Sequence, residues 1–206
     1  MTMDACDISD ACDELGIEAV RTGVLVPAWA GCPAVSGPVI TVRLEPGGDA
    51  PLADLLEVLA GAADGVVLVD LAGRVDVQCW GTALATAARR FGVRGALVNG
   101  AVRDVDGLRE LGFPTYTRGV HPARMRGRVG VVGTGVSVDI DGGVVQPGAI
   151  VAADRSGAVF FPGEHEPEVV ALARELRRRE DLQLRAITDG ADPRVAFGST
   201  EGADAT

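Results

Sequence analysis

The sequence has few aromatic residues, few histidines and no long apolar run, and each shortage limits the structures or functions that the protein can have. Aromatic residues make up 4% of the 206 residues, so the core must rest on Val, Leu, Ala and Ile. Two histidines and four cysteines without a CxxC pair argue against a zinc cluster. No apolar run approaches the roughly 20 residues that span a bilayer. Residues 1–10 lack the features of a signal peptide, and we expect a cytoplasmic protein with reduced cysteines.

Basic residues are also in the minority. The formal net charge is −10 and the isoelectric point is about 4.6. The one basic run, residues 177–179, lies in a mixed-charge segment and is expected to be solvated. A surface that binds the phosphates of a nucleic acid or a membrane is therefore not expected. Length and composition suit one domain over residues 1–206, with a polar tail at about 189–206 that is expected to fray.

Residues 80–119 carry the clearest structural pattern. Their first part predicts a helix that ends at Gly92, with an apolar stripe formed by Trp80, Leu84, Ala87, Ala88 and Phe91. A buried strand is predicted at 95–101, a second helix at 105–111 and another strand at 114–119. Helix–strand–helix–strand with short links favours a parallel α/β core.

Outside this stretch the pattern predicts further elements in order. Helices are expected at 7–16, capped by Asp7 or Ser9, at 51–62 and at 164–187. Strands are expected at 36–43 and 65–70, with irregular chain over 17–35. The Val-rich residues 130–162, cut by Gly and Pro turns, predict a β-meander or the wall of a small barrel.

Arg103 and Asp104 follow the predicted strand at 95–101. Ligands of parallel sheets collect beyond the carboxyl ends of strands, but neighbouring side chains of a strand face opposite ways. Both residues can therefore serve one pocket only if the backbone turns there. Asp104 could bind Mg²⁺ or Mn²⁺, or it could cap the helix at 105–111. Spacing alone favours the cap. Arg103 could stabilise an enolate or form a salt bridge.

Residues 92–119, GVRGALVNGAVRDVDGLRELGFPTYTRG, resemble the signature of the RraA-like family. This family includes metal-dependent 4-hydroxy-4-methyl-2-oxoglutarate aldolases and regulators of ribonuclease E. Further family blocks match in order, at 7–17, 36–43, 65–70 and 146–162. The resemblance implies a layered α/β sandwich related to swivelling phosphohistidine-type domains. It also implies a homo-oligomer, a trimer or a hexamer.

The resemblance further implies a divalent-metal-dependent lyase that acts on a 2-oxo acid through a pyruvate-type enolate. The reactions would be aldol cleavage of a 4-hydroxy-2-oxo acid, decarboxylation of oxaloacetate, or both. The Arg-Asp pair is the aldolases' motif, so Asp104 would bind Mg²⁺ or Mn²⁺ and Arg103 would hold the substrate's keto oxygen. The turn that begins the helix, Gly81, Thr82, Ala83 and Leu84, would bind the carboxylate of pyruvate with its backbone N–H groups. Its alternative is an ordinary helix start.

The sequence departs from the aldolases at two positions. Thr82 stands where they carry an Asp that manages a water exchanging protons with the enolate carbon. Threonine cannot act as a carboxylate base, although its hydroxyl can bind a water or cap the helix. We therefore expect Thr82 to take the catalytic position through its hydroxyl, and we expect a lyase diverted to a different substrate. Asn99 stands where many members carry Asp, which keeps hydrogen bonding but loses the charge.

Other functions and residues remain as alternatives. A non-catalytic regulator of the ribonuclease E inhibitor type is the main one, but such relatives generally lack the intact Arg-Asp pair. A methyltransferase would need a glycine-rich nucleotide turn after an early strand, whereas residues 71–78 hold a single glycine. Tyr116 and His121 could line the pocket, and Glu180 could reach a neighbouring subunit, but solvated or structural roles are the simpler expectation for all three.

Overall fold

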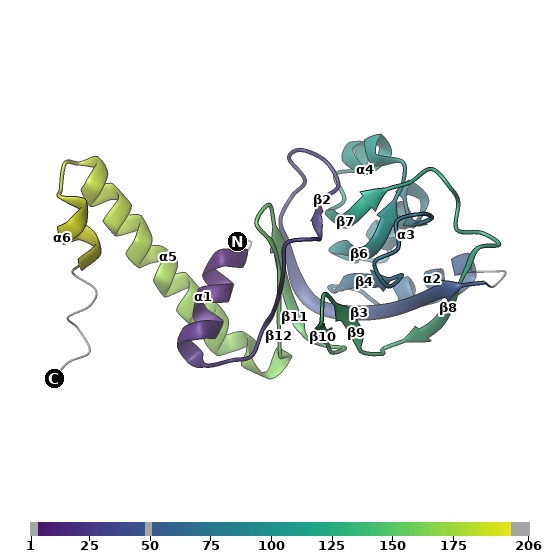
Figure 1. The fold of residues 1–206 in the computed structure, drawn as a ribbon, viewed down its shortest axis with the longest axis horizontal. Coiled ribbons are helices and arrows are strands. Elements are labelled where there is room, and N and C mark those ends of the chain that lie inside the picture. Colours follow the sequence, from purple (N-terminus) through teal and green to yellow (C-terminus); the bar gives the residue numbers. More distant parts are fainter. Residues whose placement is uncertain (1–3, 48–50, 199–206) are drawn as a thin grey trace.

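A curled mixed β-sheet forms the framework of the protein (Figure 1). The structure is a computed structural model that describes residues 4–47 and 51–198. Four neighbouring strands run parallel, in the order β3 (Val35–Pro46), β4 (Val66–Asp70), β6 (Gly95–Val102) and β7 (Thr115–Val120). The parallel core predicted around residues 80–119 is therefore confirmed. Continuous apolar runs such as β4 suit these positions because both faces of a parallel sheet are covered.

Antiparallel strands extend the sheet on both sides. On one side β3 pairs with β11 (Ile150–Asp154), followed by β12 (Gly157–Phe161) and β1 (Val20–Thr22). On the other side β7 pairs antiparallel with β2 (Val26–Pro27), whereas the short β5 (Gln78–Trp80) runs parallel to the end of β6. Two of these strands, β1 and β2, lie in the segment 17–35 that was expected to be irregular.

The predicted meander over residues 130–162 is wrong in its pairing. β8 (Val129–Thr134) returns to β3, whereas β9 (Val138–Ile140) and β10 (Gly143–Val145) form a separate hairpin. β11 then pairs with the first residues of β3. The reason is the length of β3, whose 12 residues offer one edge to β11 at its start and to β8 at its end.

Helices cover one face of the parallel strands. α2 (Pro51–Ala60), α3 (Thr82–Arg90) and α4 (Val105–Leu111) pack against side chains such as Val67 and Val69. The alternate residues Val66 and Leu68 face the other way, towards β9, β10 and β12. This alternation is the period of two expected of strands, and the layered α/β sandwich that was expected is confirmed.

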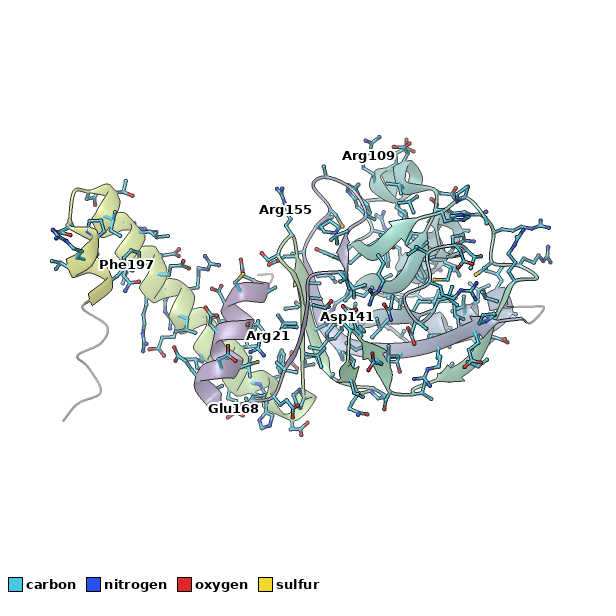
Figure 2. All side chains as sticks on the ribbon, viewed as in Figure 1. Arg21, Arg109, Asp141, Arg155, Glu168 and Phe197 are labelled. Carbon is cyan, nitrogen blue, oxygen red and sulfur yellow. The ribbon has the colours of Figure 1, made fainter. Side chains whose placement is uncertain are left out.

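The remaining helices lie at one end of the molecule. α1 (Ala5–Leu15) packs against the first half of α5 (Glu166–Thr188), which follows the one-turn helix η1 (Gly163–His165). Beyond that contact α5 projects from the sheet and carries α6 (Pro193–Gly198), where Figure 2 labels Phe197. The tail was expected to fray from about residue 189. Residues 193–198 form α6 instead, and 199–206 lie outside the described residues. None of the described helices has the length and apolar character needed to cross a membrane.

Two predicted helix starts are also corrected. α1 begins after Asp4, whose side chain accepts a hydrogen bond from the N–H of Cys6, rather than after Asp7 or Ser9. Trp80 belongs to β5, not to the following helix, because it pairs with Val102 and its buried ring stacks on Phe113. Gly81 then turns the chain into α3.

Candidate functional site

A cavity of about 550 Å³ opens at the carboxyl ends of β5 and β6. Its walls come from α2, from β5 and the start of α3, from the turn after β6, and from the loop after β7. The lining residues are Leu52, Ala53, Leu56, Gln78, Gly81, Ala83, Leu84, Arg103, Asp104, Arg124, Met125 and Arg126. This is the edge of a parallel sheet at which ligands are expected.

Arg103 and Asp104 both line this cavity. The backbone turns at Asp104, which has φ 56° and ψ 42° in the left-handed region. Asp is among the residue types that tolerate this conformation. Nε of Arg103 lies 3.3 Å from Oδ2 of Asp104. The turn that a shared pocket requires is therefore present.

The carboxylate of Asp104 does not cap α4. Asp104 occupies the N-cap position, but its side chain makes no capping hydrogen bond. Its side chain is 52% exposed, so the oxygens can be reached from the cavity. The alternative role as a helix cap, which spacing alone favoured, is thus not the role that the side chain plays.

Gly81 brings the start of α3 against the Arg-Asp pair. A Cβ atom at this position would lie 3.2 Å from Cγ of Arg103 and 3.4 Å from Oδ2 of Asp104. The first N–H groups of a helix have no partner within it, and no side chain caps α3. Gly81, Ala83 and Leu84 of this turn line the cavity, which places unpaired donors near the pair.

Thr82 belongs to the same turn but does not line the cavity. Its hydroxyl donates a hydrogen bond to the carbonyl oxygen of Asp104 at 3.2 Å. It also packs so closely on α4 that a Cβ at Gly107 would lie 2.4 Å from the Thr82 hydroxyl oxygen. The structure therefore joins Thr82 to the Arg-Asp turn through the backbone. A role for Thr82 in proton transfer stays a prediction.

Sequence reasoning missed several lining residues because they lie outside the signature. Gln78 is 5% exposed, and across residues 4–47 and 51–198 its side-chain amide has no hydrogen-bond partner in the protein. Its backbone N–H donates to the carbonyl oxygen of Ala123, which holds the loop carrying Arg124 and Arg126. Its position in the sequence could have indicated this role, because Gln78 is a polar residue at the end of the linker 71–78, just before the apolar residues Cys79 and Trp80.

The site carries a local excess of positive charge. Arg103, Arg124 and Arg126 line the cavity with Asp104 as the one acidic side chain among the described lining residues. Neither Arg124 nor Arg126 has an ion-pair partner in the described part of the chain. This excess in a protein of net charge −10 favours an anionic ligand. Burial raises the pKa of the neighbouring Cys79 thiol to about 12, so Cys79 is not a thiolate nucleophile at neutral pH.

Asn99 lies in a different cavity on the opposite face of the sheet. Its amide donates to Oδ1 of Asp70 at 2.7 Å and accepts from Arg118. Arg118 also binds Asp141, labelled in Figure 2, and this hydrogen bond lowers the pKa of Asp141. The residue is thus part of a satisfied polar network rather than of the Arg103–Asp104 site.

Three further sequence candidates lie outside the cavity. Tyr116 is buried in the opposite core, where its hydroxyl donates to backbone carbonyl groups. His121 accepts a hydrogen bond from the N–H of Ala123 at its Nδ1. Glu180 pairs with Arg177 on α5.

Known proteins are similar to this chain in both sequence and fold. The model of a family described as RraA-like, Aldolase/RraA, matches residues 5–160, which include every residue that lines the cavity. Protein DlpA of Legionella pneumophila is 29% identical over 192 residues, 91% of this chain. The match spans only 31% of the length of DlpA.

Two more relatives point in different functional directions. A Halalkalibacterium halodurans protein provisionally named as a 4-hydroxy-4-methyl-2-oxoglutarate aldolase is 27% identical, over 75% of this chain and 72% of its own. The crystal structure of Streptomyces coelicolor RraAS2, described as an unusual member of the RNase ES inhibitor RraA protein family, superposes with a TM-score of 0.78. It is 26% identical, over 88% of this chain and 92% of that one.

Proposed function

The chain belongs to the RraA-like family, and from this premise we propose that it is a lyase that cleaves a 2-oxo acid through a pyruvate-type enolate. The observation that carries the proposal is the convergence of Arg103, Asp104 and the uncapped start of α3 on one cavity. These three groups offer a guanidinium, a hard oxygen ligand and backbone N–H donors. Together they match the keto oxygen and the carboxylate of a 2-oxo acid.

The proposed aldol cleavage balances as follows. The C4 hydroxyl of a 4-hydroxy-2-oxo acid loses its proton to a water, and the C3–C4 bond breaks. C4 leaves as the carbonyl carbon of an aldehyde or ketone, while the electron pair moves into an enolate whose charge rests on the C2 oxygen. A proton added at C3 then gives pyruvate. Oxaloacetate reaches the same enolate by losing CO₂.

The residues of this chain serve the charged parts of that reaction. Arg103 would hold the C2 oxygen and stabilise the negative charge that develops there, an interaction that is stronger in the transition state than in the substrate. The N–H groups at the start of α3 would bind the C1 carboxylate. The neutral amide of Gln78 can hydrogen-bond the substrate or a water, but it cannot act as a base.

The donor set fits a hard divalent cation with one protein ligand. The described residues contain no cluster of three or more His, Cys, Asp or Glu side chains. A single carboxylate together with waters and substrate oxygens suffices for Mg²⁺, and the uncapped carboxylate of Asp104 would supply it. When bound, Mg²⁺ or Mn²⁺ would polarise the keto group and neutralise enolate charge.

The proposal is tested with a panel of 4-hydroxy-2-oxo acids and oxaloacetate, with and without Mg²⁺. Release of pyruvate that depends on the cation and is lost in Asp104→Asn supports the lyase. A control with the same substitution, Asp106→Asn on α4, should keep the activity because the Asp106 side chain is 86% exposed and does not line the cavity. Absence of turnover on every substrate, together with absence of cation binding, would contradict it.

A protein-binding regulator is the second candidate, because a solved relative is described as an RNase ES inhibitor family member. The intact Arg103–Asp104 pair at an open cavity favours the lyase, since a regulator that binds through its surface does not need an uncapped carboxylate there. Inhibition of a ribonuclease of the E type by both the wild type and Asp104→Asn, without lyase activity in either, would favour the regulator.

A further inference from the structure

Helix α2 carries two separate rows of leucines. Leu55 and Leu59, four residues apart, are 1% and 0% exposed and belong to the core under the helices. Leu52 and Leu56 form a second row with the same spacing, and residues four apart are neighbours on a helix surface. Both line the cavity of the Arg103–Asp104 site, and Leu52 is 50% exposed. The core therefore does not account for the second row.

The second row continues into a larger apolar wall. Ala53 of α2 and Met125 of the loop after β7 line the same cavity, as do Ala83 and Leu84 of α3. The C1 carboxylate and the C2 oxygen of a 2-oxo acid would contact Arg103 and the N–H groups at the start of α3. The part of the ligand beyond C3 would then meet this wall.

Arg124 and Arg126 also line the cavity, but both residues are exposed. Solvated guanidinium groups select weakly between ligands, because water screens their charge and their long side chains lose entropy on pairing. Burying an alkyl group against leucine side chains is not screened by salt and requires no charged group to lose its hydration. Each buried methylene group is worth about 0.8 kcal/mol, which is about fourfold in affinity.

We propose that the site prefers 4-hydroxy-2-oxo acids whose C4 substituent is apolar, an alkyl or aryl group, over those with a second carboxylate at that position. Cleavage then yields pyruvate and an apolar aldehyde or ketone. The proposal rests on the lyase function proposed above. Leu52 and Leu56 are its specificity-determining residues.

The experiment compares four 4-hydroxy-2-oxo acids that carry methyl, propyl, phenyl or carboxylate groups at C4. The expected kcat/KM rises about fourfold for each methylene group between methyl and propyl, and it is higher for propyl and phenyl than for carboxylate. Leu56→Asn is expected to lower the ratio of the propyl to the carboxylate substrate about tenfold. Leu15→Asn, a partly exposed leucine of α1 outside the cavity, should leave that ratio unchanged.

Exchange of the C3 protons of pyruvate with deuterium separates the two possible failures, because it needs the enolate but no C4 group. Suppose that the wild type catalyses the exchange but prefers the carboxylate substrate, or that Leu56→Asn leaves the propyl-to-carboxylate ratio unchanged. Either result would overturn the apolar preference and would leave the proposed lyase function intact. If Leu56→Asn does not fold, Leu56→Ala and the wild-type substrate series give the same decision. If the wild type catalyses neither the exchange nor any cleavage, the proposed lyase function and this inference are both overturned.

Discussion

The Thr82 hydroxyl donates a hydrogen bond to the backbone carbonyl oxygen of Asp104, at 3.2 Å. This contact joins the first residue of α3 to the left-handed residue that presents the carboxylate to the cavity. Position 82, where the aldolases that this chain resembles carry an acid, is therefore adjacent to the Arg-Asp turn. Here it holds that turn through the backbone.

Thr82→Asp is expected to raise lyase turnover. A positioned acid–base group is typically worth about 10²–10⁴-fold in rate. The new carboxylate cannot donate to the Asp104 carbonyl oxygen as Thr82 does and is repelled by it, so it must turn from that oxygen towards the cavity, where the helix dipole tolerates its charge. Repulsion of the substrate carboxylate should raise KM as well. Turnover of both forms at saturating Mg²⁺ measures the effect. Thr82→Val is the control, since it removes the hydrogen bond to Asp104 without adding an acid, and it should lower turnover. A rise in Thr82→Val equal to that in Thr82→Asp would show that loss of the hydroxyl, not the new acid, matters.

Asp104→Asn is expected to abolish cation-dependent activity and leave the thermal midpoint almost unchanged. The amide is a poor ligand for Mg²⁺, but Asn tolerates the left-handed conformation and no side-chain cap is lost. Asp104→Ala should lose the same activity and also about 1–2 kcal/mol of stability, because alanine does not favour φ 56°. Calorimetry and pyruvate release check the pair, and activity retained in the asparagine variant would exclude Asp104 as a ligand.

Arg103→Lys is expected to lower kcat about 10²-fold, the scale of losing one donor to developing negative charge. Lysine keeps the charge but not the planar fork of donors. Cation affinity, measured by Mn²⁺ titration, should change little because Asp104 remains. Equal rates in the two forms would reduce Arg103 to a source of bulk charge.

Gly81→Ala is expected to lower kcat/KM about tenfold with a small change in stability. The added Cβ would lie 3.2 Å from Cγ of Arg103, so the arginine must move by a few tenths of an ångström. Misplacing a reacting group by about 1 Å can cost 10²-fold in rate. Gly23→Ala, where a Cβ would meet nothing within 4 Å, is the matched control. A fully active Gly81→Ala variant would mean that Arg103 tolerates displacement.

The protein is expected to form a homo-oligomer, a trimer or a hexamer. The projecting part of α5 and α6 exposes apolar side chains such as Leu182 (65%) and Val195 (68%), which association would bury. Sedimentation equilibrium at micromolar concentration measures the mass. A monomer would count against this expectation. Leu182→Glu should weaken any assembly that forms through the projecting part of α5 and α6.

Local patterns in the sequence predicted much of the fold. The apolar run of β6 and the glycines at the ends of α1 and α4 mark element types and boundaries by chemistry that acts within a few residues. The pairing of β8 and β11 with opposite ends of β3 could not be predicted, because it depends on contacts between residues far apart in the chain. Trp80 was misplaced because an apolar residue at helical spacing can equally end a buried strand.

The candidate site was only partly predictable for a similar reason. Arg103, Asp104 and Gly81 lie in or near the signature, and all three line the cavity. The direction of the Thr82 hydroxyl depends on the left-handed turn at Asp104, which no spacing rule reveals. Leu52, Leu56 and Arg124 reach the cavity from other elements, so tertiary packing alone brings them there.

The two rows of leucines on α2 have a consequence for the history of the protein. Because Leu55 and Leu59 hold the helix in place, the positions of Leu52 and Leu56 are free to vary without loss of the packed interior. Substitutions at these two positions should change the free energy of unfolding little. A lineage built on this scaffold can therefore change the molecules that it processes while its architecture stays constant.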